Sequence, residues 1–231
     1  MAEKFLLPKK AARIVVLQRI ELASLFVKKL RKLFGRYIFS NFITKLFLDT
    51  EDIASKYYKT MSNEFLSIKK YINKNDNLLL SIGGGIGGLE VIINKNFKNK
   101  TFYFIERNYI SKKVKYGWGN DEAYNNFELQ KSFLKINDMN EKDFYLVDFD
   151  NDKLPLIKFD IITSLFSLDY HYDFHLYIEY LKKVSKPNTK IIFDTIRAEY
   201  FEKLFKNVEI INLNVDTVHR SKRIVCSNFI N

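Results

Sequence analysis

Apolar residues beyond position 77 fall into short continuous runs, and stretches with helical spacing separate most of these runs. The runs predict strands over residues 78–82, 101–105, 144–147, 159–165, 190–193, 208–213 and 223–227. The stretches between them predict helices that begin near residue 89 and cover 122–137, 174–184 and 198–205. Strands that alternate with helices are typical of a parallel α/β sheet. Because no helix separates the last two strands, we expect them to form an antiparallel hairpin.

The first 72 residues follow a different pattern, with helical spacing and no predicted strand. Apolar residues three and four positions apart predict one amphipathic helix through Val16, Ile20, Ala23, Val27, Leu30 and Phe34. A second helix is predicted over residues 52–71, with one apolar face formed by Ile53, Tyr57, Met61, Phe65 and Ile68. We therefore divide the chain into a helical extension over 1–72, which we expect to pack on the body as a lid, and an α/β domain over 73–231.

The positive charge of the chain is concentrated near its N-terminus. The net charge is +11, and residues 1–36 hold ten Lys and Arg against two Glu. Such a segment suits an anionic membrane surface, an RNA backbone or an ordinary solvated helix face. The single cysteine, Cys226, excludes an internal disulfide, and no apolar run approaches the length of a membrane span. We expect a cytoplasmic protein whose residues 1–36 can contact the inner face of the membrane.

A glycine-rich turn follows the first predicted strand. Five of the eight glycines lie between Gly83 and Gly88, in a pattern that fits both G-x-G-x-x-G and G-x-G-x-G. Glycine lets the backbone turn sharply and approach a ligand closely, and the start of the next helix offers free N–H groups. Glu106 ends the second strand about 20 residues later, where a carboxylate can accept ribose hydroxyls. The pattern predicts a site for a nucleoside-containing ligand.

From residue 77 to 229 the chain resembles the class I S-adenosylmethionine (SAM)-dependent methyltransferases. The glycine turn, the acid after strand two, the turn at residues 185–188 and the final hairpin carry this resemblance. It implies an α/β, Rossmann-like sheet of seven strands, six parallel and the last antiparallel, with SAM as the cofactor. In this family the glycine turn wraps the methionine part of SAM, and the acids after strands two and three bind the ribose and the adenine amine.

The resemblance assigns cofactor-binding roles to Ser81, Gly83, Gly85, Gly87, Glu106, Asp148, Phe149 and Ser164. The family often has an acid two residues before the first glycine, where this chain has Ser81. This departure leaves the methionine amino group without an assigned partner. Backbone carbonyls and Asp169 are the two alternatives.

The segment after the fourth strand has candidate catalytic residues. It lacks the Pro-Pro pair of the methyltransferases that act on base amines, which argues against that class. Cytosine-C5 methyltransferases need a cysteine nucleophile near this segment, whereas Cys226 lies on the last strand. Strand ends of open α/β sheets face the ligand, so we expect His171 to act as general base on an acceptor hydroxyl, supported by Asp169. The alternative is that His171 caps the next helix or packs against an aromatic ring. His171 and His175 have no clear third partner, so no metal is expected.

A shorter resemblance extends to sugar O-methyltransferases of bacterial surface-polysaccharide loci. It rests on Tyr170-His171-Tyr172 and Tyr124-Asn125, although Asp173 replaces the usual Pro. It implies a sugar or glycan precursor as acceptor, with substrate-contact or packing roles for Tyr116, Trp118, Tyr124 and His175. Two other hypotheses remain: an RNA or protein methyltransferase guided by the basic N-terminus, and a non-catalytic partner protein with a methyltransferase fold.

Overall fold

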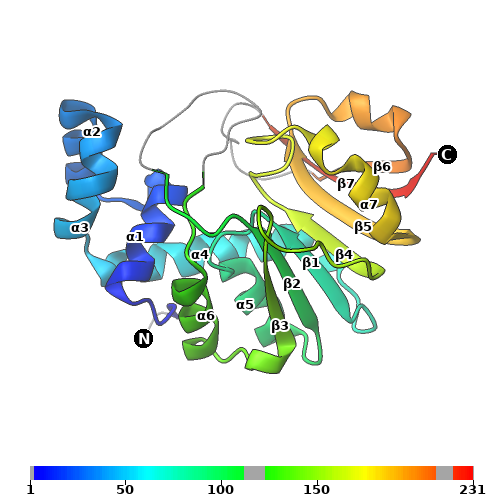
Figure 1. Cartoon of the computed structure of the whole chain (residues 1–231), viewed down its shortest axis with the longest axis horizontal. Helices are drawn as coiled ribbons and strands as arrows, with labels where there is room; N and C mark the ends of the chain where they lie inside the picture. The colour runs from blue at the N-terminus through cyan, green and yellow to red at the C-terminus, as the bar shows by residue number, and fades with distance from the viewer. Residues whose placement is uncertain (1–2, 112–122, 212–220, 231) are drawn as a thin grey trace.

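A seven-stranded sheet forms the centre of the molecule. The computed structural model describes residues 3–111, 123–211 and 221–230. Its strands are β1 (Leu78–Ile82), β2 (Thr101–Glu106), β3 (Phe144–Asp148), β4 (Phe159–Ser164), β5 (Ser185–Thr195), β6 (Phe205–Ile211) and β7 (Lys222–Phe229). They lie in the order β3-β2-β1-β4-β5-β7-β6, and β7 runs antiparallel to both neighbours. The predicted sheet of six parallel strands with an antiparallel last strand is confirmed (Figure 1).

One face of the sheet is covered by three helices and by the start of the chain. These helices are α4 (Thr50–Ile68), α5 (Gly88–Asn96) and α6 (Phe127–Ile136). Alternate strand residues such as Leu79, Phe102 and Phe104 point to this face and join one apolar core with the helices. The predicted face of α4 is confirmed, since Ile53, Tyr57, Met61, Phe65 and Ile68 are all buried.

The other face has shorter helical elements and its own core. It is covered by η5 (Phe174–Leu176), α7 (Ile178–Val184) and η6 (Ala198–Lys203), around the intervening strand residues Leu80, Ile82 and Ile105. Residues that alternate along β1 and β2 therefore serve opposite cores, and both faces of these central strands are buried. This placement leaves the carboxyl ends of the parallel strands as the open edge where the loops gather.

The N-terminal extension is built from several short helices. It contains α1 (Lys9–Gln18), η1 (Ile20–Leu22), α2 (Leu25–Ile38), the π-helical turn η2 (Phe39–Ile43) and α3 (Thr44–Leu46). The single helix predicted from Val16 to Phe34 is wrong. The chain leaves helical geometry at Arg19, with φ −133° and ψ 80°, and the Ser24 hydroxyl accepts the Val27 N–H at 3.3 Å where α2 begins. The break turns Gln18 and Arg19 toward the body of the protein.

The first helix of the extension is part of the main core. Ala12, Ile14, Val15 and Val16 are fully buried, in the same apolar cluster as α4 and α6. The side chain of Asn137 also binds the backbone of Leu6 through both its amide oxygen and its amide nitrogen, at 3.0 and 2.8 Å. Residues 5–16 are thus packed firmly on the body.

Several predicted boundaries differ from the structure. Helix α6 begins at Phe127 and not at 122, because the Asn126 side chain caps it by accepting the Leu129 N–H at 3.0 Å. The helix predicted over residues 198–205 is the shorter 3₁₀ element η6, Ala198–Lys203, and β6 starts at Phe205. β5 begins at Ser185, at the start of the predicted turn, because Ser185 pairs with Phe159 of β4. The register between the two strands shifts after this pair. The short connectors η3 (Lys69–Tyr71) and η4 (Glu141–Asp143) complete the fold.

A buried ion pair ties the reversed strand β7 to β5. Arg223 and Asp194 are 1% and 0% exposed, and two hydrogen bonds of 3.0 Å join them. The Arg223 guanidinium also donates to the Ser67 hydroxyl at 2.7 Å and pairs with Glu64 of α4. Cys226 lies buried on the same strand, and burial raises the pKa of its thiol.

Candidate active site

The glycine turn connects β1 to α5 in a strongly curved path. Gly83, Gly85 and Gly87 have φ values of 67°, 66° and 89°, a region that side chains other than glycine rarely adopt. The Gly83 N–H donates to the Ile105 carbonyl of β2 at 3.0 Å, which fixes the start of the turn on the sheet.

Neighbouring side chains occupy the space that a Cβ would need in this turn. A Cβ on Gly85 would lie 2.4 Å from Gln18 Oε1, and one on Gly84 would lie 2.2 Å from Ser81 Oγ. The Gln18 amide, held by its 2.7 Å bond to the Tyr124 carbonyl, therefore lies directly against the turn. The N-terminal extension and the turn thus form one wall.

Glu106, at the end of β2, is bonded to the glycine turn. Its Oε1 accepts the Gly85 N–H at 2.6 Å, and the Asn125 amide donates to the Gly85 carbonyl at 3.3 Å. Burial raises the pKa of Glu106 to about 8, and the nearby carboxylate of Glu90 adds to the rise, while the Gly85 N–H opposes it. The predicted ribose-binding acid therefore lies at the turn.

Glu90, in the first turn of α5, is a carboxylate that the sequence prediction missed. It is 2% exposed, and among the described residues neither of its oxygens has a hydrogen bond of full geometry, although the Ser81 hydroxyl and the Glu90 N–H lie close to the carboxylate. Burial raises its pKa to about 7, although the adjacent Ser81 hydroxyl and the Glu90 N–H offset part of the rise. Oε1 lies beside Gly84, where a Cβ would be 3.3 Å away. An unpaired buried carboxylate is costly unless a cation joins it.

A cavity of about 830 Å³ extends over the glycine turn at the carboxyl ends of the strands. Its floor includes Ser81, Glu90 and Glu106, and its walls include Gln18 and Arg19 from the extension. The remaining wall comes from the loop after β4, which includes residues 165–168 and 170–172. A volume of this size accommodates a small-molecule ligand.

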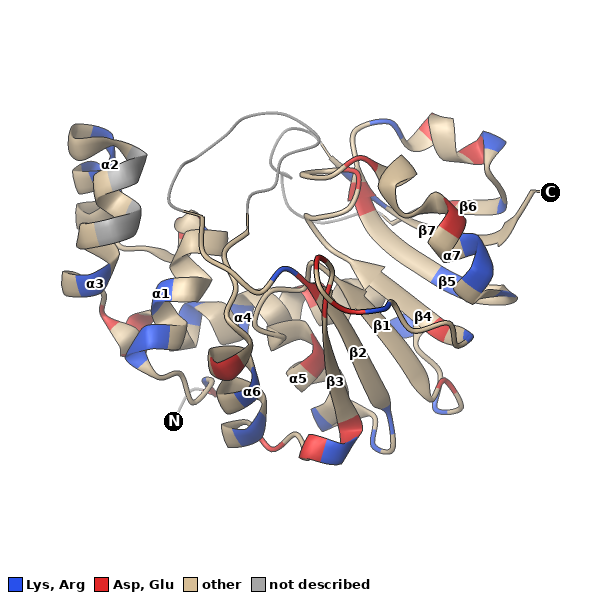
Figure 2. Cartoon of the chain, viewed as in Figure 1, with Lys and Arg blue, Asp and Glu red and all other residues tan. Residues whose placement is uncertain are grey.

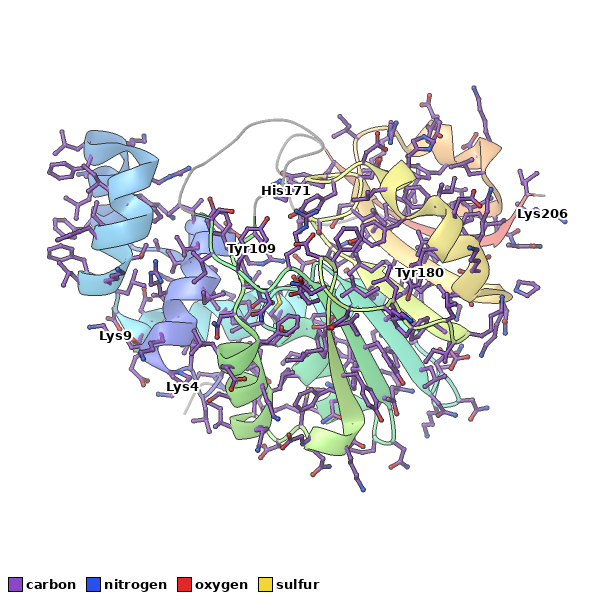
Figure 3. All side chains as sticks on the ribbon, in the orientation of Figure 1. Lys4, Lys9, Tyr109, His171, Tyr180 and Lys206 are labelled. Carbon is purple, nitrogen blue, oxygen red and sulfur yellow. The ribbon has the colours of Figure 1, made fainter. Side chains whose placement is uncertain are left out.

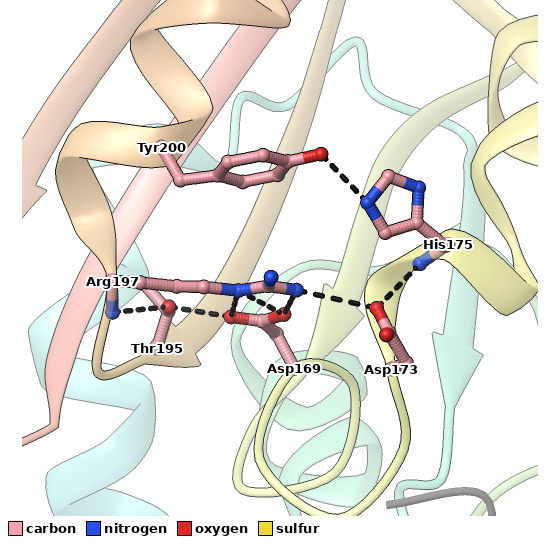
Figure 4. Close-up of polar contacts among 6 residues, drawn as sticks. All are labelled: Asp169, Asp173, His175, Thr195, Arg197 and Tyr200. Atoms are coloured by element: carbon pink, nitrogen blue, oxygen red, sulfur yellow. Dashed lines mark hydrogen bonds and ion pairs between the residues drawn. The ribbon is translucent and has the colours of Figure 1, made fainter.

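The loop after β4 is held in a compact shape by its own backbone and by Asp169. The Ser167 carbonyl accepts the N–H groups of Tyr170, His171 and Tyr172 at 3.2, 2.7 and 3.2 Å. The carboxylate of Asp169 accepts bonds from the Thr195 hydroxyl at 2.6 Å and from the Arg197 Nε at 3.1 Å, as Figure 4 shows. Asp169 is buried with a φ of 59° and does not line the cavity. Its carboxylate therefore fixes the loop that carries His171.

His171 lies at the rim of the cavity, above the carboxyl ends of the strands (Figure 3). The residue is exposed, and its ring meets the Tyr170 ring edge-on, with 4.9 Å between centroids. His171 is therefore accessible, as a general base must be, and it also makes the aromatic contact expected if it has a packing role. His175 lies outside the cavity lining, where its Nε2 is 2.7 Å from the Tyr200 hydroxyl (Figure 4).

Three predicted cofactor residues have structural tasks and do not line the cavity. Asp148 closes its own turn by accepting the Asp150 N–H at 3.2 Å and the Asn151 amide at 2.7 Å. The Ser164 hydroxyl donates to the Ile82 carbonyl at 2.7 Å and accepts the Leu168 N–H at 2.9 Å. A Cβ on Gly87 would lie 2.7 Å from Leu134, so this glycine permits close packing against α6.

The other predicted residues divide between the cavity and the undescribed segment. Phe149 lines the cavity, with the Arg107 guanidinium 5.2 Å from the centre of its ring. Tyr124 also lines it, whereas Tyr116 and Trp118 lie outside the described residues. Within the described part of the chain, no group of three or more His, Cys, Asp or Glu is arranged to hold a metal ion.

Comparison with solved structures identifies this architecture. The SAM-dependent methyltransferase SibL, in its apo form, superposes with a TM-score of 0.55 and 12% identity, covering 96% of this chain and 74% of that one. A protein from Nostoc punctiforme assigned as an O-methyltransferase gives a TM-score of 0.52 at 11% identity, over 75% of this chain and 59% of its own.

The chain has the class I SAM-dependent methyltransferase fold. This confirms the fold that the glycine turn, the strand-end acid and the final hairpin predicted. The match to the Nostoc protein spans less than two thirds of that protein's own length. No protein-family model and no curated protein sequence matches the chain.

The residues at the floor of the cavity fit the chemistry of SAM. The amino-acid end of SAM has an ammonium group, and its reactive sulfur is a sulfonium, so the ligand has two cationic centres. Glu90 supplies a buried carboxylate that has no cationic partner among the described ion pairs, and Glu106 supplies a second carboxylate close to it. The glycine turn lies between these two carboxylates and lines the cavity through Gly83, Gly84 and Gly85.

Proposed function

We propose that the protein is a SAM-dependent methyltransferase that methylates a hydroxyl of a sugar in a surface-glycan or polysaccharide precursor. The observation that supports the cofactor most directly is the buried Glu90 carboxylate, which has no cationic partner among the described ion pairs. A cation placed beside it removes the cost of the buried charge. The ammonium group of SAM is a cation of suitable chemistry at the glycine turn.

Each part of the cofactor has a proposed partner. Glu90 holds the methionine ammonium and thereby replaces the acid that the family often has at the position of Ser81. Glu106, which lines the cavity and is fixed by Gly85, accepts the ribose hydroxyls. Phe149 offers an apolar surface for the adenine. When bound, SAM supplies a methyl group activated by its positively charged sulfur.

The acceptor side is formed by the loop after β4. His171 at the cavity rim accepts the proton of the acceptor hydroxyl, which makes the oxygen a better nucleophile. Asp169 is a positioning residue, because it holds the loop through Thr195 and Arg197. Tyr124, Tyr170 and Tyr172 surround the same space and offer aromatic faces and hydroxyls to a sugar ring.

Transfer of a radioactive methyl group tests this proposal. The protein is incubated with SAM labelled in its methyl group and with a bacterial extract, and the products are separated into glycan, glycolipid, RNA and protein fractions. We expect label in the glycan or glycolipid fraction, and we expect His171→Ala to remove most of it. Label confined to RNA or protein would favour the second hypothesis, and no label in any fraction would favour a non-catalytic role.

A further inference from the structure

Residues 25–47 form a helical hairpin that projects from the rest of the N-terminal extension. Helix α2 is broken at Gly35, where φ is 74° and ψ is 173°, and the chain returns through η2 and α3. The rings of Phe26 and Phe47 meet at 6.0 Å, so the two ends of the segment lie together. In Figure 1 the hairpin lies at the edge of the molecule, away from the sheet.

The outer surface of the helical hairpin is unusually apolar. Eight of the seventeen exposed large hydrophobic side chains among the described residues belong to these 23 positions. Six of the eight are at least half exposed: Leu25 (77%), Phe26 (58%), Leu33 (74%), Phe42 (66%), Leu46 (58%) and Phe47 (50%). Exposed apolar side chains concentrated in one short segment mark a site of interaction.

The inner surface of the hairpin is anchored. Val27, Phe39 and Ile43 are 1%, 4% and 4% exposed and belong to the same core as α1 and α4. The exposed apolar side chains therefore do not result from a segment that failed to pack. They remain exposed after the hairpin has buried one face.

The charge of the hairpin has a single sign. Residues 25–47 contain six Lys and Arg and no Asp or Glu. Lys29, Lys32 and Lys45 are exposed beside the apolar side chains, and Figure 2 shows blue segments without red on α2 and α3. Apolar and basic side chains side by side suit a surface that is anionic at its headgroups and apolar beneath them.

We propose that the helical hairpin of residues 25–47 binds the surface of an anionic lipid bilayer. Its Leu and Phe side chains enter the boundary between headgroups and acyl chains, and its Lys side chains contact the headgroups. A second copy of the hairpin is a poorer occupant, because two surfaces of the same positive charge repel each other. RNA is a poorer occupant as well, because phosphate contacts leave the aliphatic Leu side chains in water.

Bilayer binding brings the cavity close to the membrane. Arg31 and Phe39 of the hairpin line the cavity, so the hairpin and the proposed active site share a wall. If the proposed methyltransferase function holds, the acceptor is presented at the membrane surface, as a glycan with a lipid anchor would be. None of the helices among the described residues is long and apolar enough to cross a membrane.

Vesicle flotation with the full chain tests this surface. The vesicles contain phosphatidylcholine alone or with 30% phosphatidylglycerol. We expect binding to the anionic vesicles that is at least tenfold stronger than to the neutral ones and that weakens as salt is added. Leu33→Ser/Phe42→Ser and Lys29→Glu/Lys32→Glu should each reduce binding at least tenfold.

A matched control replaces exposed apolar residues elsewhere. Leu156→Ser/Ile196→Ser alters side chains that are 74% and 62% exposed, similar to those of the apolar hairpin variant, and should bind vesicles like the wild type. Equal loss in the control, equal binding to neutral vesicles, or unchanged binding of the hairpin variants would overturn the proposal. So would hairpin-dependent dimerisation or RNA binding without vesicle binding. S-adenosylhomocysteine binding, measured separately, reports on the proposed function and should be unchanged in the hairpin variants.

Discussion

Oε1 of Glu106 accepts a 2.6 Å hydrogen bond from the backbone N–H of Gly85. The acid at the end of β2 is therefore joined to the turn that follows β1, and both belong to one preformed surface. The bond also explains why the sequence pairs a glycine turn with an acid about 20 residues later, because the ends of adjacent parallel strands meet at one edge.

Replacement of Gly85 by Val should abolish ligand binding at the turn. The backbone at Gly85 has a φ of 66°, and a Cβ there would lie 2.4 Å from the Gln18 side chain. Val adds both strain and a clash, so we expect at least a hundredfold loss of S-adenosylhomocysteine affinity in calorimetry. Gly35→Ala is the control, since Gly35 has a φ of 74° with nothing within 4 Å of the added carbon. Equal affinity of the Val variant and the wild type would contradict this role.

The stability of the ligand-free protein should fall as the pH rises from about 4.5 to 7. The folded protein holds the Glu90 proton up to a pKa of about 7, whereas the unfolded chain loses it near 4.5. The unfolded state therefore binds fewer protons in this range, and the folded state loses up to about 3 kcal/mol of relative stability. Ser81, Tyr57 and Glu106 are the polar groups around this carboxylate.

Glu90→Gln should reduce the slope of this pH dependence by about half in urea unfolding measurements. Glu106, whose pKa is raised to about 8, titrates over the same range and supplies the rest of the slope. Glu128→Gln on the exposed side of α6 should unfold like the wild type at every pH. A slope in Glu90→Gln that matches the wild type would show that Glu90 is not the group that titrates.

Asp169→Asn tests whether the Asp169 carboxylate holds the loop after β4 in place. Asn tolerates the φ of 59° at this position, so the backbone of the loop is kept while the ion pair with Arg197 is lost. We expect a loss of about 3 kcal/mol in the free energy of unfolding, because the Arg197 guanidinium loses its buried partner. Asp173→Asn, which alters a more exposed carboxylate, should cost less than about 1 kcal/mol. A larger effect at Asp173 than at Asp169 would be inconsistent with this network.

His171→Ala should lower the rate of methyl transfer by about a hundredfold or more and leave S-adenosylhomocysteine affinity intact. A general base accepts a proton only in its neutral form, so the wild-type rate should rise with pH. The variant should lack that rise. Full activity of His171→Ala from pH 6 to 9 would exclude His171 as the base.

The sequence predicted the sheet well because the pattern of its strands is local. β1 matched its predicted range, and β2, β3 and β4 differed by one residue at their ends. The sequence also predicted that the glycine turn and Glu106 lie together at the ends of neighbouring strands. This follows from chain geometry, because glycine permits the sharp turn and the ends of parallel strands meet at one edge of the sheet. The final hairpin followed from the absence of a helix between its strands.

The prediction failed where long-range contacts decide the structure. The continuous helix from Val16 was wrong because Ser24 starts a new helix and because Gln18 bonds to Tyr124, more than 100 residues away. Asp148 and Ser164 bond to their own turn and to β1, contacts that the sequence pattern did not reveal, and their cofactor-binding roles stay predictions. Glu90 was missed because a first-turn acid is common in helices, and only its complete burial without a cationic partner among the described residues distinguishes it.

Isothermal titration calorimetry of the purified protein with S-adenosylhomocysteine and with 5′-methylthioadenosine tests most directly the central claim, that the cavity binds SAM and that Glu90 holds its amino group. The second ligand has the adenosine but lacks the amino acid. We predict one-to-one, micromolar binding of S-adenosylhomocysteine, no binding of NADH, and an affinity for S-adenosylhomocysteine that falls at least tenfold in Glu90→Gln while that for methylthioadenosine is unchanged. Equal effects of the variant on both ligands would contradict the role of Glu90 alone. No binding of S-adenosylhomocysteine to the wild type would contradict the assignment of the cavity as a SAM site.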